Sequence, residues 1–198
     1  MPTKAEQSDA TRRALVRAAR DLFAAHGFAD TGTEAVVKAA GVTRGALYHH
    51  FRDKTDLFRA VYEDLEQELV ERVVAEVAAA GDPLAVLHRG AAAFLDACLD
   101  PAVHRVVLLE GPSVLGWATW REIDQAYGLG LVRAALEAAM GAGAIRSVPV
   151  EALSHVLLGA LVEGAMLLAN AEDRAATRAD LGEAIGALVD GLATPPTP

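Results

Sequence analysis

Thr43-Arg44-Gly45-Ala46-Leu47-Tyr48-His49-His50-Phe51 is the stretch of this 198-residue chain that most constrains its fold. The Thr43 hydroxyl can cap a helix by accepting a hydrogen bond from a backbone N–H of the first turn. Leu47 and Phe51 are four residues apart and therefore share one helical face, while the polar residues of the stretch lie on other faces. We expect a short helix over 44–50 that packs with one face and presents another to a partner.

The residues before this stretch predict that its helix is the second of a pair. Thr33 can cap a helix over 34–40, Gly41 can supply the turn that follows, and Val42 can act as a small apolar plug. Two helices joined by about three residues have the spacing of a helix-turn-helix.

A further helix is expected upstream of the pair. Ser8 or Asp9 can cap this helix, which is expected to end at His26. Gly27 can take a positive φ there, and Phe28 can pack back on the helix as in a Schellman ending. The three helices together predict a small N-terminal domain.

The remainder of the chain is predicted to be helical as well. Asp53 can cap a long fourth helix over about 54–80, and Asp56 forms an imperfect capping box with it. Alanine and leucine dominate, and no alternation of strand type persists. We therefore expect an all-α protein of about nine helices, with an N-terminal three-helix helix-turn-helix domain and a C-terminal helical bundle. Breaks between helices are expected at Gly27, Gly41, 81–83, Pro101, 111–112, 141–149 and 171–173.

Charge is distributed unevenly along the chain. Residues 1–60 hold ten Lys/Arg and seven Asp/Glu, a net charge of +3, whereas residues 61–198 hold eight and twenty, a net charge of −12. A basic N-terminal module on an acidic body can bind phosphate locally and repel it elsewhere. The charge pattern therefore suggests two separate tasks.

The expected location is the cytoplasm. The single cysteine, Cys98, cannot form an intramolecular disulfide, and the first residues are charged where a signal peptide is apolar. The apolar run over 156–171 contains Glu163 and is too short to span a bilayer comfortably. We expect a buried helix there and no membrane contact.

Polar side chains of the helix-turn-helix are placed to contact double-stranded DNA. The N-terminal residues of such a second helix lie at the base edges of the major groove, so Arg44 can contact a guanine or a phosphate. Gly45 allows a close approach, and Tyr48 can offer its ring to a thymine methyl or its hydroxyl to a phosphate, although Tyr48 could also be a packed aromatic. The expected DNA-binding residues are Thr33, Thr43, Arg44, Gly45, Tyr48, His49 and Lys54.

This part of the chain closely resembles the signature of the TetR family. The resemblance implies a homodimer with an N-terminal DNA-binding domain, a helical C-terminal effector domain and, usually, repression that a small ligand relieves. It extends to about Tyr62, and the stretch over 111–117 is similar to one that recurs in a subset of the family. The residues that carry the resemblance are Leu22-Phe23, Gly27-Phe28, Thr33, Ala40-Gly41-Val42, Leu47-Tyr48-His49-His50-Phe51 and Lys54 to Leu57.

The expected domain division follows from these assignments. Residues 1–53 are expected to form the helix-turn-helix DNA-binding domain, and residues 54–193 the ligand-binding and dimerisation domain, with the helix over about 54–80 as the link. Residues 194–198 are expected to form a disordered tail.

The last two helices, over about 149–170 and 174–192, are expected to contact a second copy of the chain. Both carry apolar residues around much of their circumference, and a helix that is apolar on more than one face needs a second partner. A twofold dimer would present two recognition helices to a palindromic operator.

A group of aromatic residues is the candidate effector pocket. Trp117, Trp120 and Tyr127 gather beside Arg121 in a chain with 5% aromatic residues. Core packing is the simpler explanation, but ligand pockets are also mostly apolar with a few polar groups. Glu163 is expected either in the pocket or as a hydrogen-bonding residue of the dimer interface. The candidate residues are His104, Glu110, Trp117, Trp120, Arg121, Tyr127, Glu163 and Met166.

Other classes of function find less support. No nucleophile elbow, phosphate-binding glycine loop or pair of carboxylates at catalytic spacing is visible, so we expect neither an enzyme nor a cofactor. Glu151 and His155 have the spacing of a metal pair but no third ligand, so an ion pair is expected and no metal site. Cys98 is expected to be a buried apolar residue rather than a redox sensor. The alternative function is a small-molecule-binding helical protein without a role on DNA.

Overall fold

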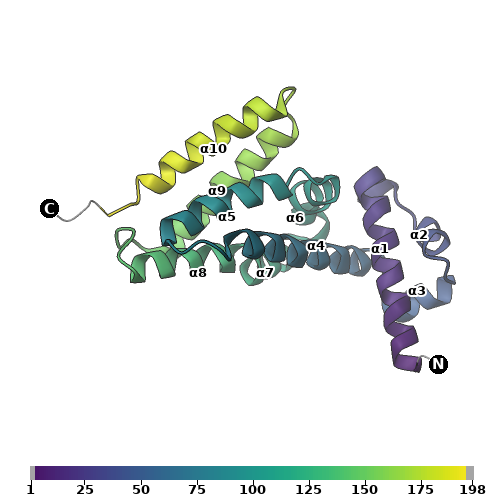
Figure 1. Ribbon diagram of the computed structural model, residues 1–198. Coiled ribbons are helices and arrows are strands. Elements are labelled where there is room, and N and C mark those ends of the chain that lie inside the picture. Colours follow the sequence, from purple (N-terminus) through teal and green to yellow (C-terminus); the bar gives the residue numbers. More distant parts are fainter. Residues whose placement is uncertain (1–2, 195–198) are drawn as a thin grey trace. The chain divides into compact units, whose positions relative to one another are not determined.

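The computed structural model describes residues 3–194 (Figure 1). These residues form ten α-helices and one π-helical segment, and their one β-type pairing is an isolated bridge between Ile145 and Ala193. The all-α prediction is confirmed. The chain groups into two compact units: one holds the residues up to Leu65 together with Pro101–Trp120, and the other holds Glu66–Asp100 and the residues from Arg121 onward. The predicted N-terminal domain contains α1 (Lys4–Asp30) and the helix-turn-helix pair α2 (Thr33–Ala40) and α3 (Arg44–His50). They are followed by α4 (Lys54–Val77), α5 (Pro83–Ala97), η1 (Val103–Glu110), α6 (Gly111–Leu115), α7 (Trp117–Ala126), α8 (Gly128–Gly141), α9 (Val150–Ala169) and α10 (Arg174–Asp190).

The core of the first unit is built from apolar residues at helical spacing. An aromatic cluster lies at its centre: the Phe23 and Phe58 ring centroids are 5.3 Å apart, and Phe28 lies 5.3 Å from Phe58. Edge-to-face contacts of this kind add to the energy of apolar burial. The buried residues that α1, α2, α3 and the start of α4 contribute are Leu15, Val16, Ala19, Phe23, Val36, Val37, Leu47, Leu57, Phe58 and Val61.

Helix α1 begins earlier than expected. Its cap is Thr3, whose hydroxyl accepts from the Glu6 N–H while the Glu6 carboxylate accepts from the Thr3 N–H. This capping box satisfies two donors, so the prediction that Ser8 or Asp9 caps the helix is wrong. Gly27 has the expected positive φ, 81°, but helical structure resumes after this kink and continues to Asp30.

The turn between α2 and α3 forms as predicted, whereas the start of α2 does not. Gly41 ends α2 in the left-handed conformation, and Thr43 caps α3 by accepting from the Ala46 N–H at 3.2 Å. The cap of α2 is Gly32, which offers no side chain, and Thr33 is already helical. The predicted cap at Thr33 is therefore wrong, and its hydroxyl is available for another contact.

The helix breaks over 111–140 differ from the expected ones. No break occurs at 111–112, because Gly111 is helical and buried against the Tyr62 ring, where a Cβ would find no room, and Pro112 lies in the first turn of α6. The chain breaks instead at Gly116, whose φ is 75°, and at Tyr127. An expected single helix is thereby divided into α6, α7 and α8.

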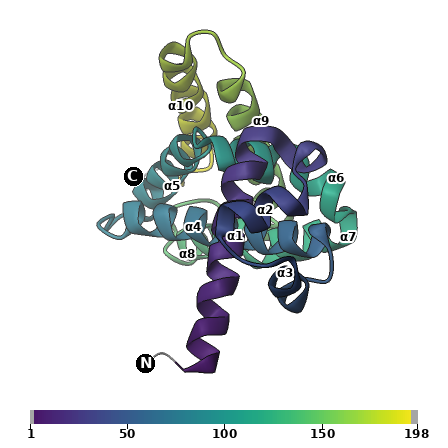
Figure 2. The same cartoon turned by 90° about the vertical axis from the view of Figure 1, so that its right-hand side faces the viewer.

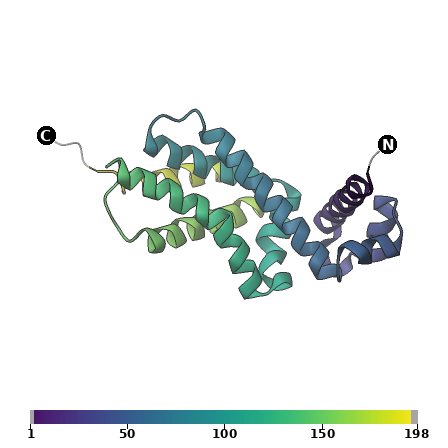
Figure 3. The same cartoon turned by 90° about the horizontal axis from the view of Figure 1, so that it is seen from below.

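The second unit is a helical bundle in which α5, α8, α9 and α10 pack side by side (Figures 1 and 3). Asp82 caps α5, with Pro83 in its first turn, and Asp173 caps α10. Within the described residues, α9 alone is long and apolar enough to cross a membrane, with a mean hydropathy of 1.8. Leu157, Leu161 and Leu168 are nevertheless buried in the bundle, so α9 is a partly buried core helix.

The expected functional boundary at residue 53/54 does not coincide with the division into compact units. Residues Pro101–Trp120, expected in the effector domain, belong to the same unit as α1, α2 and α3. Of the expected tail, the structure describes Thr194, whose backbone N–H donates to the Ala144 carbonyl at 3.0 Å. Residues 195–198 lie outside the described residues.

Candidate nucleic-acid interface

Helix α3 is anchored by one face and exposed on the other. It packs against α1 and α2, and Figure 2 shows its place in the first unit. Leu47 is fully buried and Phe51 nearly so, and the cap at Thr43 fixes the start of the helix. Arg44, Gly45 and His49 are exposed, and the Tyr48 side chain is 44% exposed. The fold therefore presents these polar side chains on a rigid helix, as recognition of a base sequence requires.

Arg44 and Tyr48 form a small cluster with the start of α2. The Arg44 Nη1 lies 3.0 Å from Glu34 Oε1, and its guanidinium lies over the Tyr48 ring at 5.6 Å. Two hydrogen bonds donated to the Tyr48 oxygen, the stronger effect from Thr33 and the weaker from Arg44, favour the phenolate and lower the pKa of Tyr48. An exposed ion pair stabilises a protein by only about 0–1 kcal/mol, so Arg44 can exchange Glu34 for a nucleic-acid group at small cost.

Gly45 lies at an exposed helical position where the chain itself does not require glycine. A Cβ at this position would meet only the Thr43 Oγ1, at 3.9 Å. Alanine is favoured over glycine in a helix by about 1 kcal/mol. The absence of a side chain at Gly45 thus favours the close approach of a partner molecule to α3.

Lys54 is bound within the unit. Its Nζ donates to the carbonyls of Phe28 at 2.7 Å and Thr31 at 3.1 Å, and it lies 4.1 Å from the centroid of the Phe28 ring. These contacts tie the start of α4 to the end of α1. The predicted contact between Lys54 and the DNA backbone stays a prediction.

His49 and His50 lie at the end of α3, beside Arg12 of α1. The two imidazole centroids are 5.2 Å apart, and the Arg12 guanidinium lies 5.5 Å from the centroid of Phe51. Burial, together with the charges of His49 and Arg12, lowers the pKa of His50, while Asp9 opposes this shift.

Glu110, a candidate pocket residue, is engaged with the end of α1. Its Oε2 accepts from the Phe28 N–H at 2.9 Å. Gly27, next to it, has a positive φ, and a Cβ there would lie 2.5 Å from the Glu110 Oε1. The carboxylate thus fixes the kink of α1 from η1, a π-helical segment of the same unit.

The eight candidate pocket residues are divided between the two units. His104, Glu110, Trp117 and Trp120 belong to the first unit, and Arg121, Tyr127, Glu163 and Met166 to the second. The two indole rings are in contact, with centroids 5.1 Å apart, and Trp117 is 66% exposed. Arg121 donates to Asp124 at 2.8 Å, and burial raises the pKa of Asp124. Glu163 is exposed, while Tyr127 and Met166 are half-buried.

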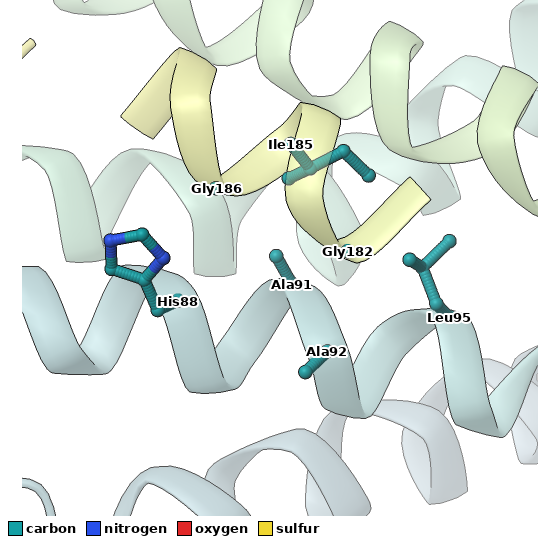
Figure 4. A pocket seen from close by; sticks show the side chains of 7 residues that line it. All are labelled: His88, Ala91, Ala92, Leu95, Gly182, Ile185 and Gly186. Carbon is teal, nitrogen blue, oxygen red and sulfur yellow. The ribbon is translucent and has the colours of Figure 1, made fainter. Parts of the chain in front are cut away.

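A cavity in the second unit lies between α5 and α10 (Figure 4). Its volume is about 30 Å³, which suits a water molecule, whereas ligand pockets are roughly 300–1,000 Å³. None of the eight candidate pocket residues lines it. The lining residues are His88, Ala91, Ala92, Leu95, Gly182, Ile185 and Gly186.

The remaining candidates for chemistry have structural explanations. Cys98 is buried, and desolvation raises the pKa of its thiol to about 12, which keeps it protonated. His155 and Glu151 lie 3.2 Å apart, so the expected ion pair forms. Across residues 3–194, no group of three or more His, Cys, Asp or Glu side chains could hold a metal ion.

Two residues of this interface were missed at the level of sequence. The sequence predicts Glu34 only as the first residue of a helix, although a helix-turn-helix brings the start of α2 near the start of α3 and so places Glu34 beside Arg44. Arg12 lies three residues before Leu15 and four before Val16, both buried, so helical spacing directs it to the same side of α1.

A helix-turn-helix whose second helix is capped and exposed, within a basic N-terminal domain of three helices, defines a DNA-binding regulator of the helix-turn-helix class. Residues 84–192 match the family described as Tetracyclin repressor-like, C-terminal domain, and residues 15–61 match Bacterial regulatory proteins, tetR family. The chain belongs to the TetR family of transcriptional regulators. This family is not enzymatic.

Individual relatives agree with this assignment. The chain is 32% identical to a TetR-family transcriptional regulator from Pectobacterium atrosepticum, with a TM-score of 0.82 over 99% of this chain and 100% of that one. It is 40% identical to the HTH-type transcriptional regulator AcrR of Shigella flexneri over 41% of this chain and 39% of that protein. It is 42% identical to the HTH-type transcriptional repressor BepR of Brucella suis over 30% of this chain and 28% of that protein. The chain thus spans less than half the length of these two curated relatives.

Proposed function

We propose that this regulator is a homodimeric repressor that binds a palindromic operator and is released from it by a small-molecule effector. The observation that carries the proposal is the exposed pair of Arg44 and Tyr48 on α3, a helix that is capped and anchored by its opposite face. Thr33 of α2 donates a hydrogen bond to the Tyr48 oxygen beside this pair. Repression is supported by the similarity of 59 residues of this chain to BepR, a transcriptional repressor.

The residues of the interface divide into two roles. Arg44 exchanges Glu34 for a guanine or a phosphate, and Gly45 allows α3 to approach the base edges. Tyr48 and His49 contact DNA beside them, while Thr33, Thr43 and Lys54 hold the sugar–phosphate backbone and fix the register. Residues 1–53 supply this DNA-binding function, and residues 54–193 supply ligand binding and dimerisation.

Dimerisation through α9 and α10 is supported by apolar side chains that these helices leave exposed. Val156 is 69% exposed, and Leu167 and Leu188 are each 57% exposed. On α9, Val156, Glu163 and Leu167 follow one another at helical spacing, so Glu163 lies on the same face. A twofold axis between two copies would set the recognition helices about 34 Å apart, one turn of DNA.

Effector release requires a ligand that binds the DNA-incompetent arrangement more tightly, with a coupling of about 1–3 kcal/mol. Helix α4 is the proposed lever, because it continues from the helix-turn-helix into the second unit. The proposed effector contacts are His104, Glu110, Trp117, Trp120, Arg121, Tyr127, Glu163 and Met166.

Genome-wide footprinting of the purified protein tests the proposal. Protected sites should be palindromic and lie at promoters, and sedimentation should show a dimer on each site. Small molecules suggested by the bound genes should then displace the protein and quench tryptophan fluorescence. Protection without a twofold sequence pattern would contradict the proposed mode of binding.

A further inference from the structure

The first turns of α1 are helical although they bury nothing. None of residues 4–13 is buried, and the capping box at Thr3 and Glu6 nevertheless fixes the start of the helix. Figure 2 shows these turns extending beyond α2. Because none of these residues is buried in the core, their polar side chains are accessible to a partner.

Arg12 is the cation of this segment that lies beside the recognition helix. Its guanidinium lies 5.5 Å from the Phe51 centroid, and Phe51 ends α3. The His50 ring is 6.3 Å from the same Phe51 ring, and His49 follows at 5.2 Å from His50. Arg12 and His50 therefore both lie beside the Phe51 ring, and exposed His49 lies next to His50 at the end of α3.

Arg12 carries the permanent positive charge beside Phe51, and the lowered pKa of His50 favours its neutral imidazole. The Arg12 guanidinium lies close enough to the partly buried His50 imidazole to disfavour its protonation. The Asp9 carboxylate has the opposite effect on the pKa of His50. Stacking on Phe51 holds the guanidinium in place but satisfies none of its N–H donors. An anion that accepts from the Arg12 guanidinium and from an imidazole N–H would use these donors.

We propose that Arg12, with His49 and His50, binds a backbone phosphate of double-stranded DNA at the C-terminal end of α3. This site is additional to the contacts of Arg44 and Tyr48, and it depends on the DNA-binding function of the chain. A phosphodiester fits because arginine forks match phosphate oxygens and because such contacts fix the register of a recognition helix without reading sequence. Sequence independence also means that the site acts on any duplex.

Salt titrations of binding to a 30-base-pair duplex of random sequence test the proposal. Neutralising one phosphate changes the slope of log K against log salt by about 0.9. Arg12→Gln should therefore reduce the slope by about 0.9 for each bound chain, while Arg12→Lys should keep the wild-type slope. Arg89→Gln, an equal charge change in the second unit, is the matched control and should leave the slope unchanged.

Thermal unfolding establishes that each variant is folded. If Arg12→Gln does not fold, Arg12→Met replaces it, because its unbranched stem can still pack on Phe51. A wild-type slope in a folded Arg12→Gln variant, or an equal loss in Arg89→Gln, would overturn the phosphate site and leave the DNA-binding function intact. A wild-type protein that shows no salt-dependent binding would contradict that function as well.

Discussion

Replacing Gly45 by alanine should stabilise the free protein and weaken its binding to DNA. In the free chain, a Cβ at this position meets only the Thr43 Oγ1, at 3.9 Å, an ordinary contact without strain. Alanine is favoured over glycine within a helix by about 0.8–1.0 kcal/mol, and Gly45 lies in the first turn, so a gain of roughly 0.5–1 kcal/mol is expected. For a chain of this size that gain raises Tm by about 1–4 °C.

The same methyl group should hinder the approach of α3 to the bases. Holding a helix away from the base edges weakens the direct contacts, each of which contributes about 1–3 kcal/mol of discrimination, so specific affinity should fall about tenfold or more. Thermal unfolding and fluorescence anisotropy on a duplex selected by the wild-type protein measure the two effects. Gly141→Ala, at the end of α8 with open space around its Cβ, is the control for helix propensity. A lower Tm, or unchanged affinity for the selected duplex, would refute the reasoning.

Three further predictions concern other parts of the molecule. Glu110→Ala leaves the Phe28 N–H without its acceptor, which should destabilise the protein by about 1–3 kcal/mol. Glu110→Gln keeps an acceptor and should lose less stability. Calorimetry compares the two variants, and equal losses of stability would argue against the hydrogen bond. The pKa of His50 is lowered below its ordinary 6.5 in the folded chain, so its contribution to stability is present above about pH 6.5 and is lost as pH falls. His50→Gln should weaken this decline in denaturant titrations between pH 8 and 5, and an unaltered pH profile would show that other groups cause it. Leu167→Asp and Leu188→Asp should yield folded monomers in sedimentation equilibrium if α9 and α10 form the dimer interface, and a persistent dimer would place that interface elsewhere.

Features that local chemistry determines were predictable from the sequence. Thr43 caps α3 and Gly41 takes a left-handed conformation because each choice depends on a few neighbouring residues. The burial of Leu47 beside exposed Arg44 and Tyr48 follows from helical spacing. The start of α1 was missed because three hydroxyl or carboxylate caps compete within its first residues, and the capping box at Thr3 prevails.

Contacts between distant residues were not predictable in the same way. Glu110 binds the Phe28 N–H across 82 positions of sequence, and no local pattern of either residue indicates this hydrogen bond. Lys54 likewise contacts the carbonyls of Phe28 and Thr31, more than twenty positions away. Such contacts depend on how helices pack, and both of them hold the end of α1 in place.

In the proposed mode of binding, α3 recognises an operator sequence through Arg44 and Tyr48. Its most direct test is the ratio of affinities for a duplex selected by the wild-type protein and for a scrambled duplex, measured at one salt concentration. The wild-type ratio should be about 10³ or more, and Arg44→Ala and Tyr48→Ala should each abolish the preference while the folded protein still binds both duplexes weakly. A wild-type ratio retained in both variants would contradict the claim.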